Sequence, residues 1–110
     1  MKYLLNSAVI TSPGEYRYQI VTPEEARQWD GGAAVSTIGY EQTADALSQL
    51  LGRQVKVDRR TITQHVGDEC LVFRLVFPHG SPRIDPGDKG RLSAALMAGQ
   101  YELGLLVRLK

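Results

Sequence analysis

Two helices with clear start and stop signals constrain the fold of this chain more than any other feature of the sequence. The first is predicted to begin after Thr22, which can cap it, with Pro23 at the first helical position and Glu25 completing a capping box. It is expected to end near Trp29, because residues 30–32 (Asp-Gly-Gly) stop a helix. Such a short helix needs other elements to bury its apolar side.

The second helix is predicted over residues 40–51, with Gly52 as its C-terminal cap. Four apolar residues recur on one face at helical spacing: Ala44, Leu47, Leu50 and Leu51. We assign this stripe to core packing. A third, short helix is predicted over residues 92–98, closed by Gly99.

Strand formers fill most of the remaining chain. The six predicted strands are residues 2–10, 15–21, 33–38, 55–65, 70–77 and 101–109. Turn signals at residues 12–14 and 66–69 predict two β-hairpins, and the proline- and glycine-rich residues 78–90 are predicted to form a loop. The order ββαβαββαβ predicts one mixed α/β (α+β) domain over residues 1–110, in which short helices flank a mixed sheet.

Composition narrows the function classes. The net charge is +1, from 13 basic and 12 acidic residues, which disfavours a protein that coats DNA. A small anionic ligand held by a few local donors fits this balance, and so does a soluble domain with no anionic partner.

Cys70 is the only cysteine, so no internal disulfide is possible, and its apolar surroundings in the sequence predict a buried, inert thiol. No cysteine or histidine spacing suggests zinc, and we expect no metal and no cofactor. No apolar stretch approaches a membrane span, and Asn6 interrupts the N-terminal apolar run. A cytoplasmic protein without membrane contact is therefore expected.

The most informative segment for function is residues 36–43, STIGYEQT, where a predicted strand ends, Gly39 allows close backbone approach and a helix begins at once. The first turn of a helix leaves about four N–H groups unpaired, with a partial positive charge that suits phosphate. Ser36, Thr37 and Thr43 add hydroxyl groups. Many strand–glycine–helix joints bind nothing, so a purely structural role is the alternative.

Six short motifs follow one another along nearly the whole chain: YLLNS (3–7), STIGYEQT (36–43), LLG (50–52), VDR (57–59), GDECLVFRL (67–75) and YELGLL (101–106). In their order and spacing these motifs resemble the type III anti-CRISPR ring nucleases. The resemblance implies a small homodimer, of viral or bacterial origin, that binds cyclic tetra-adenylate, the second messenger of type III CRISPR defence, in a pocket across the two-fold axis. It also implies metal-independent cleavage of that ring by attack of a 2′-hydroxyl on the adjacent phosphate. A symmetric ligand suits an isologous dimer.

Tyr40 is the main departure from the family, whose members carry a histidine there that protonates the leaving 5′-oxygen. A free tyrosine has a pKa of about 10, against about 6.5 for histidine. General acids work best when their pKa lies near the operating pH. Tyr40 is therefore expected to be a poorer proton donor, and cleavage to be slow or absent.

A second departure concerns the family's phosphate-stabilising arginine. Arg83, in RIDPG (83–87), fits this role, although another placement of the gap puts Val76 or Pro78 at that position. Asp58 stands where the family has asparagine, and Arg59 or Arg60 would have to offset its charge.

The candidate residues then divide by role. The catalytic candidates are Tyr40 and Arg83; the ligand-binding candidates are Asn6, Ser7, Ser36, Thr37, Ile38, Gly39, Thr43, Arg59 and Arg74. His79 is expected to be an ordinary loop residue, but could replace the missing histidine if its loop folds over the pocket.

Three functions remain open at this point. The preferred function is sequestration of a cyclic oligoadenylate by a homodimer, with slow or no cleavage. The alternatives are a fully active ring nuclease and a non-enzymatic dimeric regulator that binds protein or DNA.

Overall fold

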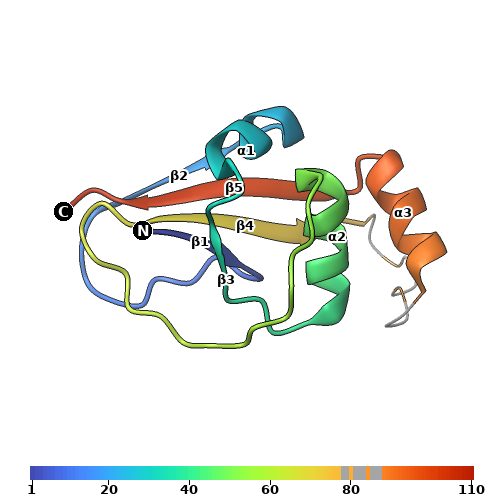
Figure 1. Cartoon of the computed structure of the whole chain (residues 1–110). Coiled ribbons are helices and arrows are strands. Elements are labelled where there is room, and N and C mark those ends of the chain that lie inside the picture. The colour runs from blue at the N-terminus through green and yellow to red at the C-terminus, as the bar shows by residue number, and fades with distance from the viewer. Residues whose placement is uncertain (78–79, 81–83, 85–87) are drawn as a thin grey trace.

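The computed structural model describes residues 1–77, 80, 84 and 88–110, and within them it contains a five-stranded sheet and three helices (Figure 1). The elements in chain order are β1 (Lys2–Leu5), β2 (Tyr16–Ile20), α1 (Pro23–Asp30), β3 (Val35–Ser36), α2 (Glu41–Leu51), β4 (Glu69–Leu75), α3 (Lys89–Met97) and β5 (Tyr101–Arg108). The strand order is β2-β5-β4-β1-β3. β1 runs parallel to β3 and β4, whereas β5 is antiparallel to β2 and β4. The predicted mixed α+β fold is confirmed.

All three helices contribute to one core on one face of the sheet. Alternate positions of three strands supply Leu4, Leu71, Phe73 and Leu103 to it. The helices supply Ala26, Ala44, Ala46, Leu47, Leu50, Leu51, Leu92 and Leu96. The predicted stripe on α2 is therefore core, as expected. The other face carries a smaller cluster, formed by Cys70, Val72 and Leu106 with Tyr3, Leu5, Tyr16 and Ile62 packed around it.

The local helix signals are confirmed in detail. The Glu25 backbone N–H donates to Thr22 Oγ1 over 3.1 Å, and the Thr22 N–H donates to Glu25 Oε1 over 3.0 Å, which together form the capping box. Gly31 and Gly52 end α1 and α2 in the left-handed region, at φ values of 53° and 70°. α3 begins at Lys89, earlier than predicted, because the Asp88 side chain caps it by accepting from the Arg91 N–H.

The predicted hairpin between the first two strands is wrong. β1 lies between β4 and β3, whereas β2 lies at the opposite edge of the sheet and pairs with β5. β1 has apolar side chains on both faces, which suits a buried strand with parallel neighbours. β2 alternates with polar residues and is largely exposed, which suits an edge.

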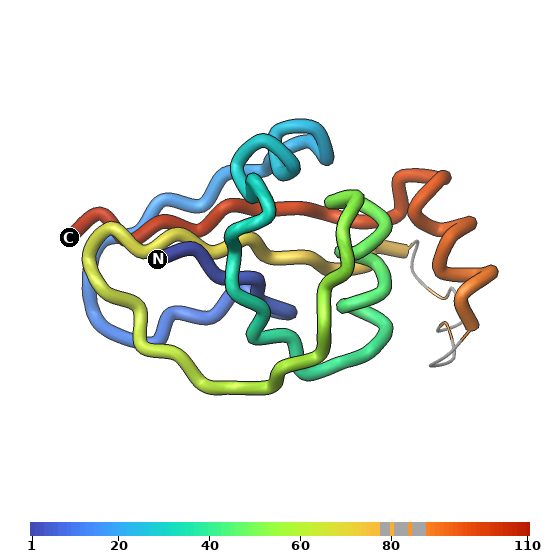
Figure 2. Tube along the Cα trace, viewed as in Figure 1, coloured from blue at the N-terminus to red at the C-terminus, as the bar shows by residue number. Residues whose placement is uncertain are grey.

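The predicted strand over residues 55–65, and with it the second hairpin, is also wrong. This segment is irregular and sweeps from the end of α2 around one margin of the sheet to β4, beside residues 6–15 (Figure 2). Its polar groups bond to side chains instead of to a strand. The Gln64 N–H donates to Thr11 Oγ1 over 2.8 Å, and Gln64 Oε1 accepts from the Thr11 N–H over 2.9 Å. Gln64, almost completely buried, thus locks the two loops together.

Cys70 is buried, as predicted. Burial raises the pKa of its thiol, which keeps the group protonated and poorly nucleophilic at neutral pH.

Candidate functional site

The candidate site lies where two neighbouring parallel strands end. Leu4 of β1 pairs with Ser36 of β3, so the residues that follow both strands emerge side by side. Asn6 and Ser7 follow β1, and residues 37–40 follow β3 and lead into α2. Ligands of α/β sheets commonly bind outside the carboxyl ends of the strands.

A pocket of about 370 Å³ opens at this edge. Its lining, which we call the Arg59 pocket, consists of Leu5, Asn6, Ser7, Val9, Thr11, Thr37, Arg59, Arg60, Thr61 and Ile62. Four of the predicted ligand-binding residues, Asn6, Ser7, Thr37 and Arg59, therefore meet in one cavity. They come from three separate segments of the chain.

Arg59 is positioned by close packing against the strand–helix joint. The Asp58 N–H donates to the Ile38 carbonyl over 3.0 Å, which ties the Arg59 segment to the end of β3. A Cβ on Gly39 would lie 3.1 Å from both Cγ and Cδ of Arg59, so any larger residue there would push the Arg59 side chain aside. The Arg59 guanidinium lies 5.9 Å from the centroid of the Tyr40 ring, within the range of a cation–π contact.

The negative charge of Asp58 is offset by a neighbouring arginine, as expected from the sequence. Its carboxylate forms an ion pair with the Arg60 guanidinium, and both side chains are about half exposed. That pair leaves Arg59 as the lining cation without a carboxylate partner among the described residues.

Several of the predicted contact residues also help to hold the strand–helix joint together. The Thr37 hydroxyl, although it lines the pocket, donates to the Leu4 carbonyl over 2.7 Å. The Ser36 hydroxyl donates to the Lys56 carbonyl over 2.6 Å, and Ile38 is fully buried. These contacts hold the joint in shape. Asn6 adds to them, since its Oδ1 accepts from the Gly39 N–H over 3.4 Å.

Tyr40 occupies the N-cap position of α2 with an extended backbone, and its side chain makes no capping hydrogen bond. The residue is 57% exposed. Its carbonyl accepts from the Ala44 N–H over 3.1 Å, which begins the helix. The phenol is therefore placed in solvent at the helix N-terminus, next to Arg59.

The remaining predicted residues do not line the Arg59 pocket. Thr43 is half-buried in the first turn of α2. Arg74 is exposed on β4 and pairs with Glu102, with 3.1 Å between Nη2 and Oε2. Arg83 and His79 lie outside the described residues, so their predicted roles stay predictions.

Sequence reasoning missed six lining residues. One is Leu5, at the end of β1; the other five, in the two loops, are Val9, Thr11, Arg60, Thr61 and Ile62. These five reach the pocket because Gln64 binds the two loops together, and the alternating pattern of residues 55–65 concealed this by predicting a strand. The signal that could have found them is the run Arg59-Arg60-Thr61, whose two adjacent basic residues are unusual for a sheet strand.

Neither a metal cluster nor a membrane helix was found in the described part of the chain. No group of three or more His, Cys, Asp or Glu side chains is arranged there to hold a metal ion. No helix among residues 1–77, 80, 84 and 88–110 is long and apolar enough to cross a membrane.

The fold and the pocket define a class of small α+β proteins in which a mixed sheet presents a polar, arginine-bearing cavity at the carboxyl ends of two parallel strands. The structure of B116 of Sulfolobus turreted icosahedral virus (STIV) has this fold, with a TM-score of 0.74 over 97% of this chain and 98% of that one, at 18% identity. The STIV B116-like family matches residues 2–77, and the chain belongs to that family.

Two sequence relatives extend the comparison. The uncharacterized protein ORF117 of Acidianus two-tailed virus is 37% identical over 114 aligned positions, covering 98% of this chain and 93% of its own length. The uncharacterized protein YddF of Bacillus subtilis (strain 168) is 36% identical over 74 positions, covering 64% of this chain and 68% of its own. The family thus includes viral members.

Proposed function

We propose that this protein binds a cyclic oligoadenylate, with cyclic tetra-adenylate as the first candidate, and antagonises type III CRISPR signalling by sequestering it. The observation that carries the proposal is the Arg59 pocket. It brings Asn6, Ser7 and Thr37 together with an arginine beside the start of α2. Arginine and helix N–H groups are the donors that phosphodiester oxygens require.

Pocket size favours a ligand shared between two copies. A volume of about 370 Å³ is at the lower end of the range for small-molecule sites, about 300–1,000 Å³. A ring of four nucleotides therefore needs more than one such cavity. In a homodimer, a two-fold axis beside the pocket would double the site and match the symmetry of the ring.

The chemistry at Tyr40 favours sequestration over rapid turnover. In-line attack of a 2′-hydroxyl needs a proton donor for the leaving 5′-oxygen, and Tyr40 offers a phenol where the family resemblance expects the imidazole of a histidine, which is the side chain suited to acid–base chemistry at neutral pH. A fully active, metal-independent ring nuclease is the alternative. It is favoured by one observation: the phenol is solvent-accessible beside Arg59 and is free to donate a hydrogen bond.

The test is calorimetric titration of cyclic tetra-adenylate in the presence of a chelator, together with chromatography of the products. Arg59→Ala should weaken binding by about ten- to a hundredfold, because charge-assisted hydrogen bonds contribute roughly 1.5–3 kcal/mol. Arg17→Ala is the matched control, since Arg17 is an exposed arginine on β2 and does not line the pocket. Absence of binding by the wild type to any cyclic oligoadenylate would refute the proposal. Equal losses in both variants would refute the role of this pocket.

A further inference from the structure

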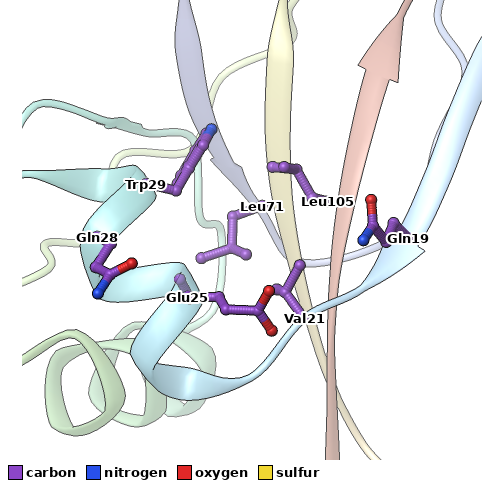
Figure 3. Close-up of a pocket in the computed structure, with 8 residues that line it drawn as sticks. Gln19, Val21, Glu25, Gln28, Trp29, Leu71 and Leu105 are labelled. Carbon is purple, nitrogen blue, oxygen red and sulfur yellow. The ribbon is translucent and has the colours of Figure 1, made fainter.

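A second cavity, of about 430 Å³, lies between α1 and the sheet (Figure 3). We call it the Trp29 cavity. Its lining consists of Gln19, Val21, Glu25, Ala26, Gln28, Trp29, Leu71 and Leu105. None of these residues lines the Arg59 pocket, and the cavity opens on the helix-bearing face of the sheet, where Leu71 belongs to the main core.

The cavity exists because α1 meets the sheet through a small side chain. Ala26 is the buried apolar residue of this short helix, and it leaves space above Leu71 and Leu105. Trp29 forms one wall of the cavity and is positioned by contacts with Lys2. The Lys2 ammonium lies 5.3 Å from the indole centroid and donates to the Trp29 carbonyl over 2.6 Å.

The charge of the lining is opposite to that of the Arg59 pocket. Glu25 is the ionisable residue of the lining, which contains no lysine, arginine or histidine. Its Oε1 accepts the capping bond from the Thr22 N–H, which leaves Oε2 for another donor. In Figure 3 the carboxylate points toward Val21, above the apolar floor. An exposed carboxylate of this kind repels phosphates and carboxylates and attracts cations.

The other polar groups of the lining have spare hydrogen-bonding capacity. Within the described part of the chain, the side-chain amides of Gln19 and Gln28 have no hydrogen-bond partner. The Trp29 indole N–H is buried and likewise has no partner among the described residues. Gln19 and Gln28 are exposed, so their amides can bond to water, whereas the buried indole N–H is a group whose hydrogen bonding is incomplete.

We propose that the Trp29 cavity is a second ligand site, for small aromatic amines. The ring of the ligand packs against Trp29 over Leu71 and Leu105, and its ammonium group binds the Glu25 carboxylate. The site is independent of the one proposed for cyclic oligoadenylate, because it has different residues and the opposite charge preference.

Trp29 is the only tryptophan in the sequence, so intrinsic indole fluorescence reports on this cavity alone. The probes are benzylamine, benzyl alcohol and benzoate, which share a ring and differ in charge. Benzylamine should change the Trp29 fluorescence saturably, with a dissociation constant of the order of millimolar for so small a ligand. Benzyl alcohol should bind more weakly, and benzoate should give no saturable change.

Glu25→Gln is the decisive variant, because glutamine can keep the capping box while the charge is removed. This variant should weaken the binding of benzylamine about two- to fivefold, as expected for a partly exposed ion pair. The binding of benzyl alcohol should be unchanged. Glu24→Gln is the control: Glu24 is exposed in the same helical turn and does not line the cavity. Gln19→Phe should fill the mouth of the cavity and abolish the response.

The proposal is overturned if benzylamine gives no saturable change, or if benzoate binds as tightly as benzylamine. It is also overturned if Glu24→Gln weakens the binding of benzylamine as much as Glu25→Gln does. Circular dichroism melting of each variant confirms that it is folded. Titration of cyclic tetra-adenylate into Glu25→Gln should match the wild type, which separates this site from the Arg59 pocket.

Discussion

Gly39 and Arg59 show how a single residue without a side chain shapes the candidate site. The Arg59 side chain packs so closely over Gly39 that a Cβ on residue 39 would force the arginine side chain to move. This contact places the positive charge beside the start of α2 and over the Tyr40 ring. The family resemblance pointed to both residues, and the structure adds the physical reason why they occur together.

In the proposed function, Tyr40 is the residue at which binding and cleavage separate. Tyr40→His should raise the rate of cyclic tetra-adenylate cleavage in the presence of a chelator, because a general acid matched to neutral pH contributes about 10²–10⁴-fold. Affinity should change little, since the hydrogen bonds that hold the joint involve the backbone of residue 40. Chromatography of products under single-turnover conditions measures the rate.

Tyr40→Phe is the matched control for that experiment. It keeps the ring beneath Arg59 and removes the hydroxyl, so any cleavage that depends on the phenol should disappear. If the wild type cleaves fast and Tyr40→Phe cleaves equally fast, Tyr40 is not the acid. His79, outside the described residues, is then the next candidate.

At the scale of elements, Asp30 joins the end of α1 to the chain after α2. Its carboxylate accepts from Arg53 Nε and Nη2, each over 2.8 Å, and from the Gly32 and Ala34 N–H groups. Burial alone would raise the pKa of Asp30, but the hydrogen bonds from Arg53 and these N–H groups outweigh it and hold the pKa below its ordinary value. The ionised form is therefore favoured by the folded state.

The lowered pKa predicts how this link responds to acid. A carboxyl group whose pKa falls on folding stabilises the protein above its unfolded-state pKa of about 3.9. That contribution is lost as the pH falls below about 4, toward the folded-state pKa. Asp30→Asn should lower the free energy of unfolding by about 1–3 kcal/mol at pH 7 and by less at pH 3. Urea denaturation at the two pH values measures this difference; an equal loss at both would contradict the assignment.

Gln64 makes a second contact between distant segments, because it joins the loop of residues 6–15 to that of residues 55–65. Both loops contribute to the Arg59 pocket. Gln64 Nε2 donates to the Val9 carbonyl over 2.8 Å, in addition to the paired bonds with Thr11. Together with the bond from the Ser12 hydroxyl to the Gln64 carbonyl, these contacts fix the two loops that carry most of the Arg59 pocket relative to each other. A buried polar side chain of this kind links fold stability to the shape of a site.

At the scale of the whole molecule, the exposed apolar side chains of the described residues are spread over many elements, and three of them lie in the two loops that carry the Arg59 pocket. Val9 and Ile10 are 46% and 60% exposed in the first loop, and Val57 is 48% exposed in the second. The proposed dimer, with its axis beside the pocket, would bury these three side chains.

Light scattering coupled to size exclusion tests that arrangement. The wild type should be a dimer at micromolar concentration, and Ile10→Asp should shift it toward monomer and weaken cyclic tetra-adenylate binding, because a charge would be buried in the interface. Met97→Asp is the control, since Met97 is 90% exposed on α3, away from both loops. A wild-type monomer that binds the ring at full strength would contradict a shared site.

The first two helices could be predicted from the sequence alone, and the third apart from its first turn, for a physical reason. Thr22, Glu25 and Gly31 act within a few residues of one another, and so do the apolar stripe of α2 and Gly52. Capping bonds and helical periodicity are local interactions, so they can be predicted without knowledge of the rest of the chain. The buried state of Cys70 could be predicted for a similar reason, from its apolar neighbours.

Tertiary structure alone decided the strand partners and the walls of the site. A strand pattern shows which faces are apolar but not which strand lies alongside, so β1 and β2 were predicted as a hairpin although β4 and β5 separate them. Residues 55–65 alternate like a strand, yet Gln64 in this segment forms paired hydrogen bonds with Thr11 of a distant loop and does not pair with a neighbouring strand. Because those partners are some 50 residues apart in the chain, only the folded structure brings Arg60, Thr61 and Ile62 to the pocket.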